Sequence, residues 1–97
     1  MEAFLSDIGY IWDELKFALV QQEHDVDFYE VIQAFEDPHA LDEPDPQGNW
    51  GRYMVVGRTL SQRILQIIYS DEDLPLTRLI TAFDANDYWS TLYEQRD

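Results

Sequence analysis

The sequence has no cysteine and no long apolar segment. Without cysteine, its 97 residues can form no disulfide bond, thiolate nucleophile or cysteine-based zinc site. No apolar run approaches the roughly 20 residues needed to cross a bilayer, and no basic segment precedes a hydrophobic stretch at the start. We therefore expect a protein with no membrane segment and no signal peptide, acting in the cytoplasm.

Basic residues are also scarce. Six lysines and arginines stand against twenty aspartates and glutamates, which gives a formal net charge of -14, and Lys16 is the only lysine. Nucleic acids and anionic membranes are bound mainly through cations, so this charge disfavours both as ligands of the whole surface. It suits a basic protein partner, mimicry of a nucleic acid, adaptation to high salt, or solubility alone.

What is present is enough material for one core. Hydrophobic residues make up 45% of the chain and aromatic residues 14%. This length and composition predict a single folded domain over residues 1–97.

Apolar periodicity predicts three helices and up to five strands. The helices are expected over Asp13–His24, Asp27–Phe35 and from Asp84 to about Gln95, with Asp13 as an N-cap. The strands are expected over Tyr10–Trp12, Ala40–Glu43, Arg52–Thr59, Arg63–Tyr69 and Leu76–Phe83.

The order of these segments predicts the fold class. Consecutive strands joined by short turns are antiparallel. We expect an α+β fold, with an antiparallel sheet of three to five strands and both N-terminal helices and the C-terminal helix packed on one face. Aromatic residues are expected in the core (Trp12, Phe28, Phe35, Trp89, Tyr93), whereas Trp50 in a glycine-containing loop is expected to be exposed.

Several motifs lie along the chain in a recognisable order: Trp12-Asp13-Glu14 with Lys16, then Glu23-His24-Asp25-Val26, Phe35-Glu36-Asp37-Pro38, Arg52 with Gly57, and Arg78-Leu79-Ile80-Thr81-Ala82-Phe83. In this order and spacing they resemble the BrnT family of toxins, which belongs to the RelE-like superfamily. The resemblance covers about residues 10 to 94. It implies a metal-independent RNA endonuclease, the toxin of a type II toxin–antitoxin pair, with a DNA-binding antitoxin as its protein partner.

The sequence departs from the family pattern mainly in charge. Glu23 stands where the family has lysine, Val20 where it has asparagine, and Phe83 where it has arginine, and Asp84 and Asp87 replace later basic residues. These changes keep a second function open. The chain would then be a non-enzymatic acidic protein that mimics nucleic acid and inhibits a basic nucleic-acid-binding partner, as phage anti-CRISPR proteins do.

The catalytic candidates are His24, Arg52 and Arg58. An imidazole can act as general acid or base near neutral pH, and guanidinium groups can hold a phosphate. His24 could instead bind the last carbonyls of its helix, and the two arginines could pair with carboxylates. RNA is expected as a ligand only if toxin activity survives. No spacing suits a metal or cofactor, so none is predicted.

Overall fold

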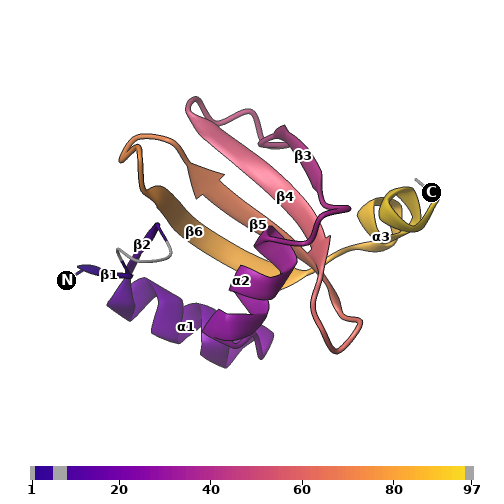
Figure 1. Cartoon of the computed structure of the whole chain (residues 1–97), viewed down its shortest axis with the longest axis horizontal. Helices are drawn as coiled ribbons and strands as arrows, with labels where there is room; N and C mark the ends of the chain where they lie inside the picture. Colours follow the sequence, from indigo (N-terminus) through magenta and orange to yellow (C-terminus); the bar gives the residue numbers. More distant parts are fainter. Residues whose placement is uncertain (1, 6–8, 96–97) are drawn as a thin grey trace.

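The computed structural model describes residues 2–5 and 9–95, which form one mixed sheet and three helices (Figure 1). The six strands lie in the order β1-β2-β6-β5-β4-β3. The strands are β1 (Glu2–Leu5), β2 (Tyr10–Asp13), β3 (Leu41–Pro44), β4 (Arg52–Arg58), β5 (Ile64–Ser70) and β6 (Thr77–Asp84). The helices are α1 (Glu14–His24), α2 (Phe28–Phe35) and α3 (Asp87–Glu94).

The α+β class is confirmed, but the prediction of a fully antiparallel sheet of three to five strands is wrong. β2 and β6 pair in parallel, with Tyr10 opposite Thr77 and Trp12 opposite Leu79. Most of the chain connects these two strands, which is the kind of long connection that parallel pairing requires. The sixth strand, β1, was not predicted.

Carboxylates begin the first two helices. The side chain of Asp13 accepts a hydrogen bond from the Lys16 backbone N–H at 2.9 Å, as the predicted N-cap should. Asp27 and Glu30 form a capping box at the start of α2, in which each side chain accepts a backbone N–H from the other end of the turn. Local sequence therefore fixes where both helices start.

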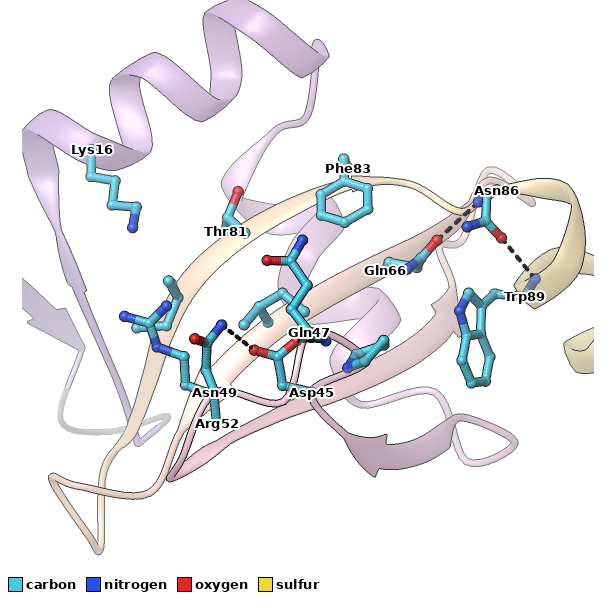
Figure 2. A pocket seen from close by; sticks show the side chains of 13 residues that line it. Lys16, Asp45, Gln47, Asn49, Arg52, Gln66, Thr81, Phe83, Asn86 and Trp89 are labelled. Carbon is cyan, nitrogen blue, oxygen red and sulfur yellow. Dashed lines mark hydrogen bonds between the residues drawn. The ribbon is translucent and has the colours of Figure 1, made fainter.

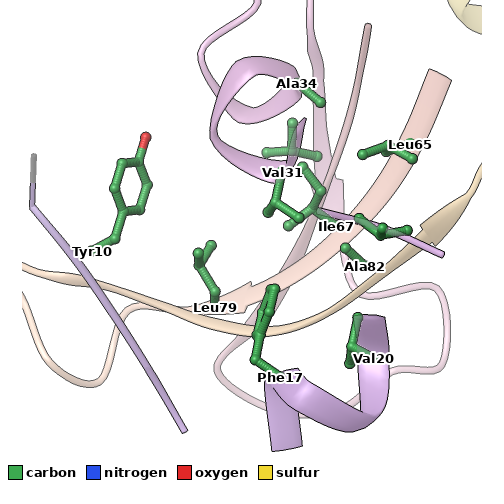
Figure 3. Close-up of a cluster of buried hydrophobic side chains, with 11 residues drawn as sticks. Tyr10, Phe17, Val20, Val31, Ala34, Leu65, Ile67, Leu79 and Ala82 are labelled. Carbon is green, nitrogen blue, oxygen red and sulfur yellow. The ribbon is translucent and has the colours of Figure 1, made fainter. Parts of the chain in front are cut away.

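The main core lies between one face of the sheet and helices α1 and α2 (Figure 3). Val55 of β4, Leu65 and Ile67 of β5, and Leu79 and Ala82 of β6 are buried on this face. The helices contribute a matching set of buried side chains, Phe17, Val20, Val31 and Ala34. Burial of this apolar surface is the main force that holds the two helices on the sheet.

Gly57 sets how closely α2 approaches β4. A Cβ atom at this position would lie 1.9 Å from the backbone oxygen of Ala34. Both residues are fully or almost fully buried. The strand therefore needs glycine here for packing, and not for an unusual backbone angle.

Helix α3 does not join the other two helices on that face, so this part of the predicted arrangement is wrong. Its start is held by Gln66 of β5, whose side-chain oxygen accepts the Asn86 backbone N–H at 2.9 Å. Because successive side chains of a strand alternate, Gln66 points away from the face that carries Leu65 and Ile67. None of the eight residues of α3, all within the described part, is fully buried.

Candidate functional site

A pocket of about 400 Å³ lies on the sheet face opposite α1 and α2 (Figure 2). Its floor is formed by side chains of β5 and β6, among them Gln66, Ile68, Thr81 and Phe83. Lys16 of α1 lies on one side and Trp89 of α3 on the other, with the β3–β4 loop between them (Figure 2). Three segments that are distant in sequence thus form its rim.

Two cations line this pocket, Lys16 and Arg52. Lys16 follows the cap of α1, and Arg52 is the first residue of β4. Both are exposed, and within residues 9–95 neither forms an ion pair. They are therefore available to an anionic ligand.

Two further arginines are engaged with carboxylates. Arg63 donates to Asp84 and lies 3.3 Å from Glu30, and it also donates to the backbone carbonyl of His24 at 2.9 Å. Arg78 pairs with Glu72 at 3.3 Å and with Asp73. These two arginines bind the ends of helices and turns to the sheet. Their positive charge is compensated by the carboxylates with which they pair.

The β3–β4 loop is braced by Asp45. Its carboxylate accepts the Gln47 backbone N–H at 3.0 Å and the Asn49 side-chain amide at 2.8 Å. The hydrogen bond from Gln47 is the largest cause that lowers the pKa of Asp45, and the charge of Arg52 adds to it. Asp45 is therefore ionised at neutral pH and holds the loop beside Arg52.

The opposite rim depends on a short hydrogen-bonded chain (Figure 2). Gln66 is buried, and its amide binds both the Asn86 backbone and, at 3.3 Å, the sulfur of Met54. The Asn86 side chain in turn accepts the Trp89 backbone N–H at 3.0 Å. Trp89 was expected in the core, but it lines the pocket instead.

His24 lies at the end of α1 and does not line the pocket. Its imidazole ring is 5.8 Å from the ring of Phe83, which does line it, and 3.9 Å separates its Nε2 atom from Glu23. The His24 side chain is 38% exposed. The histidine thus borders the site, with one aromatic ring between them.

Arg58 lies at the opposite end of β4 from Arg52. Its guanidinium is 5.2 Å from the centre of the Tyr93 ring and 3.8 Å from Glu94. Six residues of strand span roughly 20 Å, so Arg52 and Arg58 are too far apart to hold one phosphate together. The three predicted catalytic residues therefore do not converge at a single point.

The sequence predicted Arg52 as a site residue but did not place Lys16, Gln66 or Trp89 in a functional site. Lys16 had a signal, since it is the sole lysine and part of a family motif. The other two had none, because only the tertiary structure brings them to the pocket. Among the described residues, no cluster of histidines and carboxylates could hold a metal ion, and no helix is long and apolar enough to span a membrane.

Comparison with known proteins gives a consistent result. A family model described as the ribonuclease toxin BrnT of type II toxin–antitoxin systems matches residues 12–88. The fold is similar to the crystal structure of the Brucella abortus ribonuclease toxin BrnT, with a TM-score of 0.64 and 21% sequence identity. That alignment covers 80% of this chain and 96% of the Brucella chain. No curated protein matches the sequence.

Proposed function

Because the chain belongs to the BrnT family of ribonuclease toxins, we propose that it is the toxin of a type II toxin–antitoxin pair and cleaves RNA at the pocket beside Arg52. The single observation that carries this proposal is the position of the two cations. In a protein with a net charge of -14, the two described cations that form no ion pair line the same pocket. A partner antitoxin would hold the toxin inactive in the cytoplasm.

The proposed chemistry is attack of a ribose 2′-oxygen on the adjacent phosphorus, which forms a 2′,3′-cyclic phosphate and breaks the bond from phosphorus to the 5′-oxygen of the next nucleotide. A general base removes the 2′-hydroxyl proton, and the departing 5′-oxygen takes up a proton from a general acid. Arg52 and Lys16 would hold the phosphate and stabilise the negative charge that develops on it in the transition state. The step as proposed uses only side chains of this chain and the RNA itself.

We assign proton transfer to His24, because an imidazole can both remove and return a proton near neutral pH. The contact between its ring and Phe83 supports a position at the edge of the RNA path. Arg58 is proposed to contact a different phosphate, because the length of β4 separates it from Arg52. These two roles are testable one residue at a time.

The test is expression of the chain without a partner in a bacterium, with growth and messenger RNA integrity followed together. We expect growth arrest and RNA decay with the natural sequence, and loss of both with Arg52→Ala. Arg52→Lys, which keeps the charge but loses the forked guanidinium, should retain partial activity. Gln22→Glu is the matched control, because it shifts the net charge by the same unit at an exposed site of α1.

His24→Ala and Arg58→Ala belong in the same series. His24→Ala should remove cleavage while leaving RNA binding intact, and Arg58→Ala should weaken binding more than the cleavage step. Normal growth with intact RNA, at protein levels equal to those of a toxic relative, would refute the nuclease proposal.

The net charge supports a second candidate function. A chain with twenty acidic residues could imitate the phosphate backbone and occupy the nucleic-acid channel of a basic protein. The predicted result differs from that of the toxin, because expression would leave growth normal and the protein would compete with DNA or RNA for its target. Competition that Arg52→Ala leaves unchanged would favour this function.

A further inference from the structure

Trp50 is a large aromatic side chain held in full solvent exposure. It is 100% exposed, and it lies at the tip of the loop that Asp45 braces. Gly48 and Gly51 flank it with φ angles of 75° and 76°, in the left-handed region that favours glycine. Trp50 therefore buries nothing within the chain, and its whole indole surface is open for a flat ligand to stack on.

The surface around Trp50 continues into the pocket described above. Two further hollows of about 340 Å³ each are lined by Trp50, and Arg52 lines both of them as well as the main pocket. Arg52 is therefore shared by two adjoining surfaces: the pocket that contains Lys16, here called the Lys16 side, and the hollows that contain Trp50, here called the Trp50 side. A chain of nucleotides whose phosphate is held by Arg52 would place a neighbouring base over Trp50.

The charged side chains differ between the Lys16 side and the Trp50 side, and this difference suits each side to a different part of a nucleotide. Lys16 and Arg52 line the pocket with one carboxylate, Asp45, whose two oxygens already accept hydrogen bonds within its own loop. In the hollow beside Trp50, Arg52 is the one cation against two carboxylates, Asp71 and Glu72. Carboxylates repel a phosphate but accept hydrogen bonds from the N–H groups of an uncharged base. The phosphate therefore belongs on the Lys16 side and the base on the Trp50 side.

Asp71 is the carboxylate with capacity for such a base. It is exposed, forms no ion pair within residues 9–95, and accepts one hydrogen bond, from the Tyr53 hydroxyl at 3.2 Å. Glu72, by contrast, is already bound by Ser70 and Arg78. Of the four RNA bases, guanine presents two adjacent N–H donors on its Watson–Crick edge, which one carboxylate can accept together.

We propose that Trp50 and Asp71 form a nucleobase subsite, in which guanine stacks on the Trp50 indole and donates to the Asp71 carboxylate. This inference rests on the proposed function and names the substrate as single-stranded RNA with guanine next to the phosphate held by Arg52. Single-stranded bases are open to stacking on aromatic side chains, whereas paired bases are not.

The test measures binding without cleavage. Five-nucleotide RNAs with 2′-O-methyl sugars lack the attacking hydroxyl, and a version with one central guanine is compared with a version with one central adenine by fluorescence anisotropy. Stacking on an aromatic side chain predicts that Trp50→Ala weakens binding of the guanine oligonucleotide by about fivefold or more. Asp71→Asn keeps an acceptor for Tyr53 and should abolish the preference for guanine over adenine.

Tyr29→Ala is the matched control, because Tyr29 is an exposed aromatic residue on α2 and lines neither hollow. It should bind both oligonucleotides as the natural sequence does. Unchanged binding by Trp50→Ala overturns the subsite, as do equal binding of guanine and adenine or no binding of either oligonucleotide. Loss of antitoxin binding alone in Trp50→Ala overturns it too and makes Trp50 a protein anchor.

Growth arrest separates this inference from the proposed function. A toxic chain whose Trp50→Ala variant binds the guanine oligonucleotide normally keeps the function and refutes the subsite. A non-toxic chain with guanine-dependent, Trp50-dependent binding keeps the subsite and refutes the toxin.

Discussion

Replacing Gly57 with alanine should destabilise the fold by forcing α2 away from the sheet. The new Cβ would lie 1.9 Å from the Ala34 oxygen and 2.7 Å from its carbonyl carbon. Ordinary contacts begin near 3.4 Å, so the helix and strand must separate by about 1.5 Å. The obstacle is backbone, and no side chain can rotate away to relieve it.

Two effects of this substitution oppose each other. Overpacking in a dense core costs about 1–3 kcal/mol and sometimes more, and separating α2 from β4 also loosens the packing around Val31. Alanine restricts the unfolded chain more than glycine does, which returns about 0.4–1 kcal/mol. Because the clash is with backbone, we take the upper end of the overpacking cost, about 3 kcal/mol, and expect a net loss of about 2–2.6 kcal/mol in the free energy of unfolding, a large part of what a small domain has.

Urea denaturation followed by circular dichroism measures this loss. With an m-value of about 1–3 kcal/mol/M, the midpoint should fall by about 0.7 M or more. Gly48→Ala is the matched control, since its φ is +75° but nothing lies within 4 Å of the new Cβ. It should lose about 1 kcal/mol from backbone strain alone. If Gly57→Ala loses no more than Gly48→Ala, the close approach of α2 to β4 is refuted.

Three further predictions concern a helix cap, an ion pair and the pocket. Asp27→Ala removes the hydrogen bond that the Asp27 carboxylate accepts, while the backbone N–H of residue 27 can still donate to Glu30, and it should lower the free energy of unfolding by about 1 kcal/mol in the same urea assay; an unchanged midpoint would contradict the cap. The hydrogen bond from Arg63 lowers the pKa of Asp84 in the folded protein below its value in the unfolded chain. The ion pair therefore stabilises the fold above the unfolded pKa, and this stabilisation is lost as the pH falls through the folded pKa. Asp84→Asn should therefore have a lower free energy of unfolding than the natural sequence at pH 7. Below the folded pKa of Asp84 the two proteins should be equally stable, and a difference in stability that persists there would contradict the ion pair. For RNA binding, the slope of log binding constant against log salt concentration should become shallower in the double variant Lys16→Ala/Arg52→Ala. The expected change is about 0.7 for each phosphate that the protein no longer neutralises. An unchanged slope would show that neither cation contacts the RNA.

Part of the site could be predicted from sequence because it lies in family motifs. Arg52 was named from such a motif, and the exposure of Trp50 was expected from the glycines beside it and is confirmed. Trp89 was expected in the core because its spacing suits an apolar helix face. It lines a pocket instead, since α3 is anchored by Gln66 on the opposite side of the sheet.

The sequence alone determined the local structure and the family. Helix starts at Asp13 and Asp27 depend on carboxylates that bind nearby N–H groups, and strands such as β5 depend on runs of apolar residues a few positions long. These interactions join residues close in the chain, so a pattern can reveal them. The excess of acidic residues is likewise a property of composition.

Only the tertiary structure decided which charges remain available and where they meet. The residues next to Arg63 in sequence do not show that it forms an ion pair with Asp84, 21 positions away. Nor do local residues show that Lys16 and Arg52 form no ion pair within residues 9–95. The parallel pairing of β2 with β6 likewise joins segments from opposite ends of the chain. Such contacts depend on the path of the whole backbone, because ion pairs and strand pairs act through space and carry no fixed spacing in sequence.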